Sequence, residues 1–167
     1  MKVGVIGGGA WGTALAQVAA QGGETRLWAR EAEVVRSIAE AQENVLFLPG
    51  VPLSEAIRPT ADLADLSDCD LWLVVTPAQH MRAVLEAAPP CAGALLLCSK
   101  GIEEESGKLL HTVARETCPD ASVMVLSGPT FAHEVAAGLP TALTLAAEDE
   151  ADAEAVRDRL ALPAFRI

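Results

Sequence analysis

Three glycines near the start of the chain have the spacing of a turn that binds phosphate groups. Gly7, Gly9 and Gly12 follow the apolar run at residues 2–6 and precede the alanine-rich run at residues 13–20. In a dinucleotide-binding turn, the first glycine allows a tight bend, the second lets a pyrophosphate approach the backbone, and the third lets a helix pack on a strand. The amides and the positive dipole end of that helix face the phosphates. The pattern therefore predicts a strand, a phosphate-binding turn and a helix.

Two residues of opposite charge follow the next apolar segment, residues 25–28. Arg30 offers a planar cation that can stack on adenine or pair with a 2′-phosphate, which favours NADP. Glu31 could accept a hydrogen bond from a ribose hydroxyl, as acidic residues do in NAD-selective folds. The two residues favour opposite cofactors, so the sequence leaves both NADP and NAD open.

Further candidates follow the other predicted strands, where ligands bind in open parallel sheets. Pro77 can open a helix and is predicted to shape the turn under the nicotinamide end of the cofactor. His80 is more typical of an ordinary first-turn histidine than of an acid/base group. Lys100 is suited to binding an anion or orienting a carbonyl, and Thr130, just after Gly128, is suited to a phosphate or hydroxyl-bearing substrate.

The elements that must hold these residues alternate along the chain as parallel βαβ units do. Strands are predicted at residues 2–6, 25–28, 71–75, 95–98, 122–126 and 142–146. Helices are predicted at residues 10–21, 31–42, 78–87, 106–116, 132–137 and 150–160. We therefore expect an α/β fold, a Rossmann-like, mostly parallel twisted sheet with helices on both faces, forming a single nucleotide-binding domain over residues 1–167.

Composition narrows the classes of partner. The net charge is −11, and no cluster of Lys and Arg exists to bind nucleic acid or an anionic membrane. The four cysteines and three histidines lack ligand spacing, so we assign no metal and no disulfide framework, and we expect a cytoplasmic protein. No apolar run approaches the roughly 20 residues of a membrane span, and no secretion leader is apparent.

Several blocks together resemble one family, the bacterial-type NAD(P)-dependent glycerol-3-phosphate dehydrogenases. The matching blocks are Gly7-x-Gly9-x-Trp11-Gly12-Thr13-Ala14-Leu15-Ala16, Trp28-x-Arg30, Asn44-x-x-Phe47-Leu48-Pro49, Ser99-Lys100-Gly101-Ile102-Glu103, Ser127-Gly128-Pro129-Thr130-Phe131-Ala132-x-Glu134 and Ala137-Gly138-Leu139-Pro140-Thr141. They extend over the whole chain in order. Their number makes the resemblance far more specific than the glycine spacing alone.

The resemblance implies reversible hydride transfer between nicotinamide and C2 of dihydroxyacetone phosphate, giving sn-glycerol 3-phosphate for glycerophospholipid synthesis. It implies nucleotide contacts from Ala10, Trp11, Arg30, Phe47 and Ala132. Lys100 would touch both cofactor and substrate, and Gly128 and Thr130 would help hold the substrate. The small-molecule substrate would be the protein's partner, and the full-length enzyme would be a homodimer.

One departure from the family concerns length. Family members are about twice as long, and the resemblance places their general acid/base lysine in a C-terminal helical domain. The three lysines of this chain, Lys2, Lys100 and Lys108, all precede that region. We therefore expect the cofactor-binding half of the enzyme, with little or no turnover by itself and with exposed apolar surface near its C-terminal edge. A related hydroxyacid or 6-phosphogluconate-type dehydrogenase and a non-enzymatic nucleotide-binding module remain as alternatives.

Overall fold

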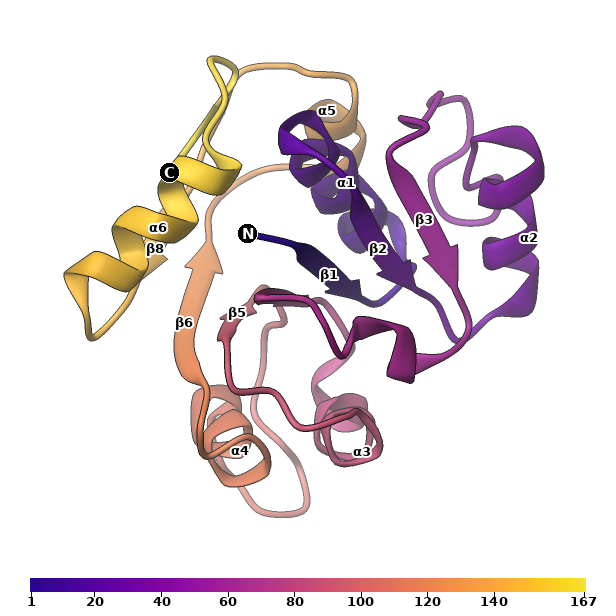
Figure 1. The fold of residues 1–167 in the computed structure, drawn as a ribbon. Helices are drawn as coiled ribbons and strands as arrows, with labels where there is room; N and C mark the ends of the chain where they lie inside the picture. Colours follow the sequence, from indigo (N-terminus) through magenta and orange to yellow (C-terminus); the bar gives the residue numbers. More distant parts are fainter.

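The computed structural model describes all 167 residues as a central sheet with helices on both faces (Figure 1). The strands are β1 (Val3–Ile6), β2 (Thr25–Trp28), β3 (Ile57–Thr60), β4 (Leu71–Val74), β5 (Ala94–Leu97), β6 (Ser122–Ser127), β7 (Thr141–Ala142), β8 (Thr144–Ala146) and β9 (Phe165–Arg166). The helices are α1 (Ala10–Ala19), α2 (Ala32–Ala41), α3 (Met81–Ala87), α4 (Leu110–Thr117), α5 (Ala132–Ala136) and α6 (Glu150–Leu160). Short 3₁₀ turns lie at η1 (Ala20–Gly22), η2 (Leu63–Leu66) and η3 (Ala78–His80).

The main sheet has seven strands in the order β3-β2-β1-β4-β5-β6-β8. The first six are parallel, and β8 pairs antiparallel with β6 at the edge. The order 3-2-1-4-5-6 is that of a doubly wound dinucleotide-binding fold, and the chain reverses its winding between β1 and β4. The predicted Rossmann-like, mostly parallel sheet is therefore confirmed.

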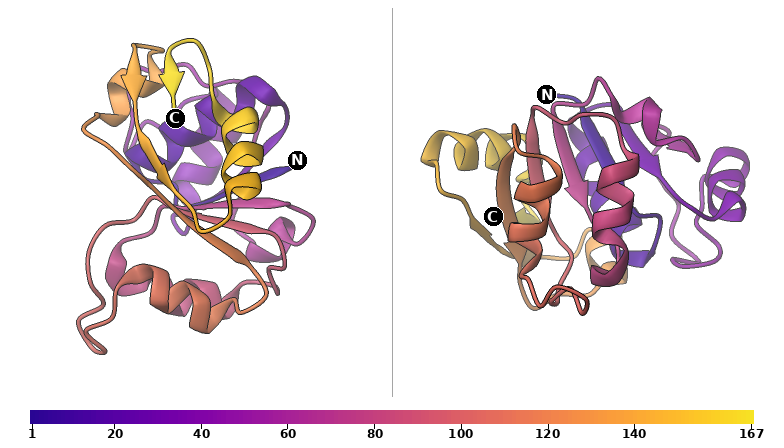
Figure 2. Two further views of the ribbon diagram at one scale, coloured as in Figure 1. Left: turned by 90° about the vertical axis from the view of Figure 1, so that its left-hand side faces the viewer. Right: turned by 90° about the horizontal axis from the view of Figure 1, so that it is seen from below.

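Alternate side chains of the buried strands point to opposite faces and fill two separate cores. Val3 and Val5 of β1 lie in a cluster of 28 buried residues beneath α1, α2, α5 and α6. Ile6 and Trp72 lie in a cluster of 13 buried residues beneath α3 and α4. The two helix layers are seen above and below the sheet in the left view of Figure 2. Strands that are buried on both faces account for the continuous apolar runs of the sequence.

The edge strand β3 was not predicted from the sequence. Its sequence, Ile57-Arg58-Pro59-Thr60, has a single fully buried residue, Ile57, and it pairs only with β2 in the main sheet. Proline is tolerated on an edge strand because its missing N–H faces away from the neighbouring strand. A strand at the edge of the sheet needs few apolar residues, so it lacks the continuous apolar run from which strands were predicted.

The predicted strand at residues 142–146 is divided in two. Thr141–Ala142 pairs in parallel with β9 in a separate two-stranded sheet, while Thr144–Ala146 joins β6. Leu143 lies between them and is buried in the larger core. The predicted helix at residues 106–116 is also too long, since α4 begins at Leu110 and an isolated bridge joins Ile102 to Leu109.

None of the helices combines the length and the apolar character needed to cross a membrane.

Candidate functional site

The carboxyl ends of three strands meet at one level of the sheet. Ile6, the last residue of β1, is paired with Trp28 of β2 on one side and with Val74 of β4 on the other. The residues that follow these strands therefore gather at the point where the winding reverses, where a crevice forms in such folds. They line a long cleft of about 410 Å³, bounded by Gly7, Gly8, Gly9, Trp11, Trp28, Arg30, Glu31, Phe47, Val75, Thr76, Pro77, His80, Val84, Cys98 and Ser99.

In the glycine turn beside the cleft, neighbouring atoms of the fold leave no room for a side chain at two positions, Gly7 and Gly12. Gly7 has a φ of +128°, its amide donates to the Trp28 carbonyl at 3.0 Å, and a Cβ there would lie 2.8 Å from the Val75 carbonyl oxygen. At Gly12 a Cβ would lie 1.8 Å from the Gly7 carbonyl oxygen. These glycines are required for α1 to pack against the turn.

Gly9 differs from both. Its φ is −71°, which suits any residue, and a Cβ there would meet no atom within 4 Å. The fold of this chain therefore gives no steric reason for glycine at this position. A group that must approach the backbone from the cleft would supply one.

A polar pair at the ends of β4 and β5 was missed by the sequence analysis. The Ser99 hydroxyl donates to the Thr76 carbonyl at 2.6 Å, which joins the two strand ends. The Thr76 hydroxyl is buried and has no hydrogen-bond partner within the chain. An unpaired buried hydroxyl costs about 1–3 kcal/mol. The signal that could have found Thr76 is its place directly after a predicted strand.

Asn44 connects the glycine turn to the segment that carries Phe47. Its side-chain amide is buried and donates to the Gly8 carbonyl at 2.9 Å and to the Thr13 hydroxyl at 2.8 Å. Its side-chain oxygen accepts the Phe47 amide at 3.1 Å. Asn44 thereby fixes Phe47 at the wall of the long cleft, a positioning role that no local pattern indicates.

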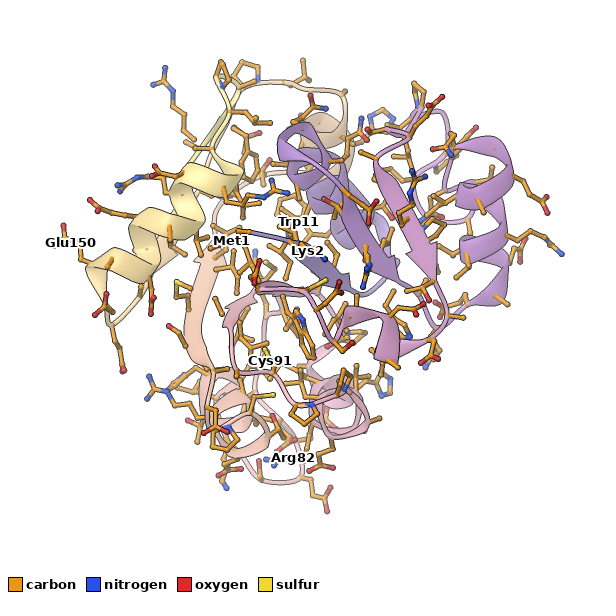
Figure 3. All side chains as sticks on the ribbon, viewed as in Figure 1. Met1, Lys2, Trp11, Arg82, Cys91 and Glu150 are labelled. Carbon is orange, nitrogen blue, oxygen red and sulfur yellow. The ribbon has the colours of Figure 1, made fainter.

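A second hollow, the side pocket, adjoins the long cleft. It has a volume of about 280 Å³ and is lined by Trp11, Cys98, Lys100, Leu126, Ser127, Gly128, Thr130, Phe131 and Ala132. Trp11 and Cys98 line both hollows. Trp11 lies at the start of α1 (Figure 3). The two hollows therefore meet along the walls that these two side chains form.

The predicted site residues divide between the two hollows. Gly7, Gly9, Trp11, Arg30, Phe47 and Pro77 line the long cleft. The side pocket is lined by four others, Lys100, Gly128, Thr130 and Ala132. Lys100 and Ala132 were predicted to contact the nucleotide, but they do not line the long cleft. Ala10 and Gly12 line neither hollow, because Ala10 packs on the larger core and Gly12 is buried. His80, which the sequence analysis set aside, does line the long cleft.

The cysteine shared by the two hollows, Cys98, is a buried thiol. All four cysteines are free thiols, and burial raises the pKa of Cys98 far above its ordinary value. Its thiol stays protonated at neutral pH and serves as apolar wall. No three His, Cys, Asp or Glu side chains come together in a way that could hold a metal ion.

The loop after Lys100 is held down by an ion-pair network. Arg82 donates from Nε and Nη2 to the two carboxylate oxygens of Glu103, both at 2.9 Å, and Nη2 also donates to Glu116 at 2.9 Å. The Ser106 hydroxyl donates to Glu103 as well. Arg82 lies in the helix layer of α3 and α4 (Figure 3). The network thus anchors the loop that delivers Lys100 to the side pocket.

This network predicts an acid-sensitive contribution to stability. Hydrogen bonds from Arg82 and Ser106 lower the pKa of Glu103 from 4.5 to about 2. Because the folded pKa lies below the unfolded one, the stabilisation is complete above about pH 4.5 and is lost as the pH falls toward 2. We expect Glu103→Gln to lower the melting temperature at pH 7 by about 3 °C. The difference in melting temperature between Glu103→Gln and the wild type should become smaller at pH 4 and smaller again at pH 3, when unfolding is followed by circular dichroism.

Glu104→Gln is the matched control. The Glu104 side chain is exposed and only its backbone amide is bonded, to Gln79. The Glu104→Gln variant should therefore have the melting temperature of the wild type at every pH. A Glu103→Gln deficit that is equally large at pH 7 and pH 3 would contradict the assignment.

The fold and the cleft define a class of protein before any comparison is made. A doubly wound sheet with a glycine turn at its winding reversal, opening into a crevice, is a dinucleotide-binding domain. Residues 2–153 match the family described as NAD-dependent glycerol-3-phosphate dehydrogenase N-terminus. The chain belongs to this family, which confirms the resemblance.

Individual relatives agree with the family. Glycerol-3-phosphate dehydrogenase [NAD(P)+] of Caulobacter vibrioides is 57% identical over 169 residues, covering 99% of this chain and 51% of the relative. The enzyme of the same name from Erythrobacter litoralis is 53% identical, covering 99% and 50%. The crystal structure of glycerol-3-phosphate dehydrogenase from Coxiella burnetii superposes with a TM-score of 0.90 at 32% identity, covering 99% of this chain and 52% of that one. The chain thus spans about half the length of the relatives it matches.

Proposed function

We propose that this chain is the cofactor-binding half of an NAD(P)-dependent glycerol-3-phosphate dehydrogenase, which interconverts dihydroxyacetone phosphate and sn-glycerol 3-phosphate. The observation that carries the proposal is the pair of adjoining hollows, one beside the glycine turn and one beside Lys100. They meet at Trp11 and Cys98. A cofactor in the first and a substrate in the second would be in contact there.

We propose that a dinucleotide lies in the long cleft, with its parts beside different strand ends. Arg30 and Trp28 lie at the end of β2, the glycine turn lies in the middle, and Thr76 and Pro77 lie at the end of β4. We assign the adenosine to the β2 end, the pyrophosphate to the glycine turn and the nicotinamide to the β4 end. The guanidinium of Arg30 offers a planar surface on which adenine can stack.

Three features of the chain support this assignment. The ten-residue helix α1 begins beside Gly9 with no side-chain cap and no acidic residue in its first turn, so its first amides are left for an anion. The open space at Gly9 admits a phosphate against the backbone. The unpaired Thr76 hydroxyl at the opposite end would gain a partner from a polar group of the cofactor.

The side pocket suits a small phosphorylated substrate. Lys100 is the one charged residue in its lining, and Ser127 and Thr130 add hydroxyls. The ammonium group would neutralise negative charge on the substrate, and the hydroxyls would bind its polar atoms. When bound, nicotinamide supplies the hydride, and the residues of this chain hold the substrate beside it. We also propose that the product serves glycerophospholipid synthesis in the cytoplasm and that the full-length enzyme is a dimer.

A titration of the full 167-residue chain tests the proposal. Trp11 and Trp28 line the long cleft, so nucleotide binding should quench their fluorescence, whereas Trp72 is buried in the core. We expect saturable quenching by NADH or NADPH. Addition of sn-glycerol 3-phosphate to the NAD-bound chain should then give a further saturable change.

The outcomes separate the alternatives. Absence of saturation with both NADH and NADPH would contradict a dinucleotide site. Saturation by nucleotide with no response to sn-glycerol 3-phosphate at millimolar concentration would favour a nucleotide-binding module that lacks the substrate site.

A further inference from the structure

Two opposite charges face each other at the β2 end of the long cleft. Arg30 donates from Nε and Nη2 to the same carboxylate oxygen of Glu31, at 3.3 and 3.1 Å. Both residues line the cleft, and His80 is the one other titratable side chain besides Cys98 in its wall. The second carboxylate oxygen of Glu31 takes no part in the pair.

Backbone hydrogen bonds on both sides fix the position of the segment that carries Arg30 and Glu31. The Ala29 amide donates to the Thr60 carbonyl at 3.0 Å, and Ala29 is buried. On the other side, Glu31 is the N-cap of α2, and its carbonyl accepts the amides of Val34 and Val35 at 3.0 and 3.3 Å. Arg30 and Glu31 therefore occupy a two-residue link that is anchored at both ends. A ligand in the cleft can reach both side chains, since 72% of Arg30 and 34% of Glu31 is exposed.

We propose that Glu31 is a specificity-determining residue that opposes the 2′-phosphate of NADP and so keeps the cleft open to NAD. The inference rests on the proposed function and adds to it the residue that sets the balance between the two cofactors. NAD and NADP differ at the adenosine ribose, where NAD has a 2′-hydroxyl and NADP a doubly charged phosphate. The charges that meet this group decide which cofactor is preferred.

The ion pair meets the two cofactors differently. A 2′-phosphate must take the Arg30 donors away from Glu31 and accept a neighbouring carboxylate of like charge. A 2′-hydroxyl makes neither demand, because it can donate to the unused carboxylate oxygen while adenine stacks on the intact ion pair. The pair is therefore compatible with NAD as it stands and must rearrange for NADP.

Glu31→Gln tests this inference in the 167-residue chain. The variant keeps the size of the side chain and its capacity to accept a hydrogen bond but removes the charge. We expect the affinity for NADPH to rise about tenfold, since one like charge beside the phosphate is removed and Arg30 is released. The affinity for NADH should change by less than about threefold, because the carboxamide oxygen can still accept the ribose hydroxyl.

Glu33→Gln is the matched control, because it removes one negative charge from the first turn of the same helix at an exposed position outside the cleft. It should leave the ratio of the two affinities at its wild-type value. Arg30→Gln should lower the affinity for NADPH more than that for NADH. If the wild type binds both nucleotides and Glu31→Gln leaves their ratio unchanged, or shifts it only as much as Glu33→Gln does, the inference is overturned. Failure of the wild type to bind either nucleotide would instead overturn the proposed function.

Discussion

Gly9→Ala should weaken the binding of NADH and NADPH by about 100-fold while leaving the fold intact. The added methyl group would enter the space that we assign to the pyrophosphate, because nothing in the chain lies within 4 Å of it. The phosphates could then no longer reach the amides of the first turn of α1. The affinity is read from the tryptophan titration, and the melting temperature is measured on the same samples.

Stability should change little for two reasons that oppose each other. Alanine is a poorer N-cap than glycine, which costs a few tenths of a kcal/mol or more. Alanine also restricts the unfolded chain, which stabilises by about 0.4–1 kcal/mol where the native φ suits it, and the φ of −71° at Gly9 does. A variant that binds nucleotide as the wild type does would show that no phosphate approaches Gly9.

Gly12→Ala should have the opposite profile, a large loss of stability. The Cβ of the new alanine would lie 1.8 Å from the Gly7 carbonyl oxygen, and this backbone atom cannot rotate away as a flexible side chain could. The start of α1 would have to move away from the turn, and α1 carries seven buried residues. We expect a destabilisation of about 3 kcal/mol or more, beyond the gain of about 1 kcal/mol in helix propensity.

Thermal and urea unfolding of the two variants beside the wild type measures the contrast. A loss of about 3 kcal/mol corresponds to a melting temperature lower by roughly 10 °C in a chain of this size. Because Gly9 and Gly12 are three positions apart at the same helix start, each serves as the control for the other. A Gly12→Ala chain that unfolds at the wild-type temperature would contradict the close packing of α1 on the glycine turn.

The sequence by itself determined the elements whose signals are local. Strands buried on both faces, such as β1 and β4, appear as continuous apolar runs, and α6 was predicted at its observed bounds. The glycine spacing identified the turn, although only Gly12 answers a local constraint, the nearby Gly7 carbonyl, whereas Gly7 itself is limited by Val75 from a distant part of the chain. The matching blocks identified the family, which the comparison confirmed.

Tertiary structure decided what depends on residues far apart in the chain. The edge strand β3 forms because β2 offers it backbone partners, and β8 reverses direction to cover the edge of β6, although neither has an apolar pattern that requires this. The loop before α4 is bonded through Glu103 to Arg82, which lies 21 residues earlier in the sequence.

The site shows the same division. The sequence placed its residues after the strands, but only the register of β1, β2 and β4 brings them to one cleft, and only the fold assigns Lys100 and Ala132 to the side pocket. The Asn44 link to Gly8 likewise joins residues that are far apart in the chain. Residue types and spacing determine which chemistry is available, whereas packing between distant segments determines which groups meet, because a hydrogen bond or an ion pair requires its atoms within about 3–4 Å.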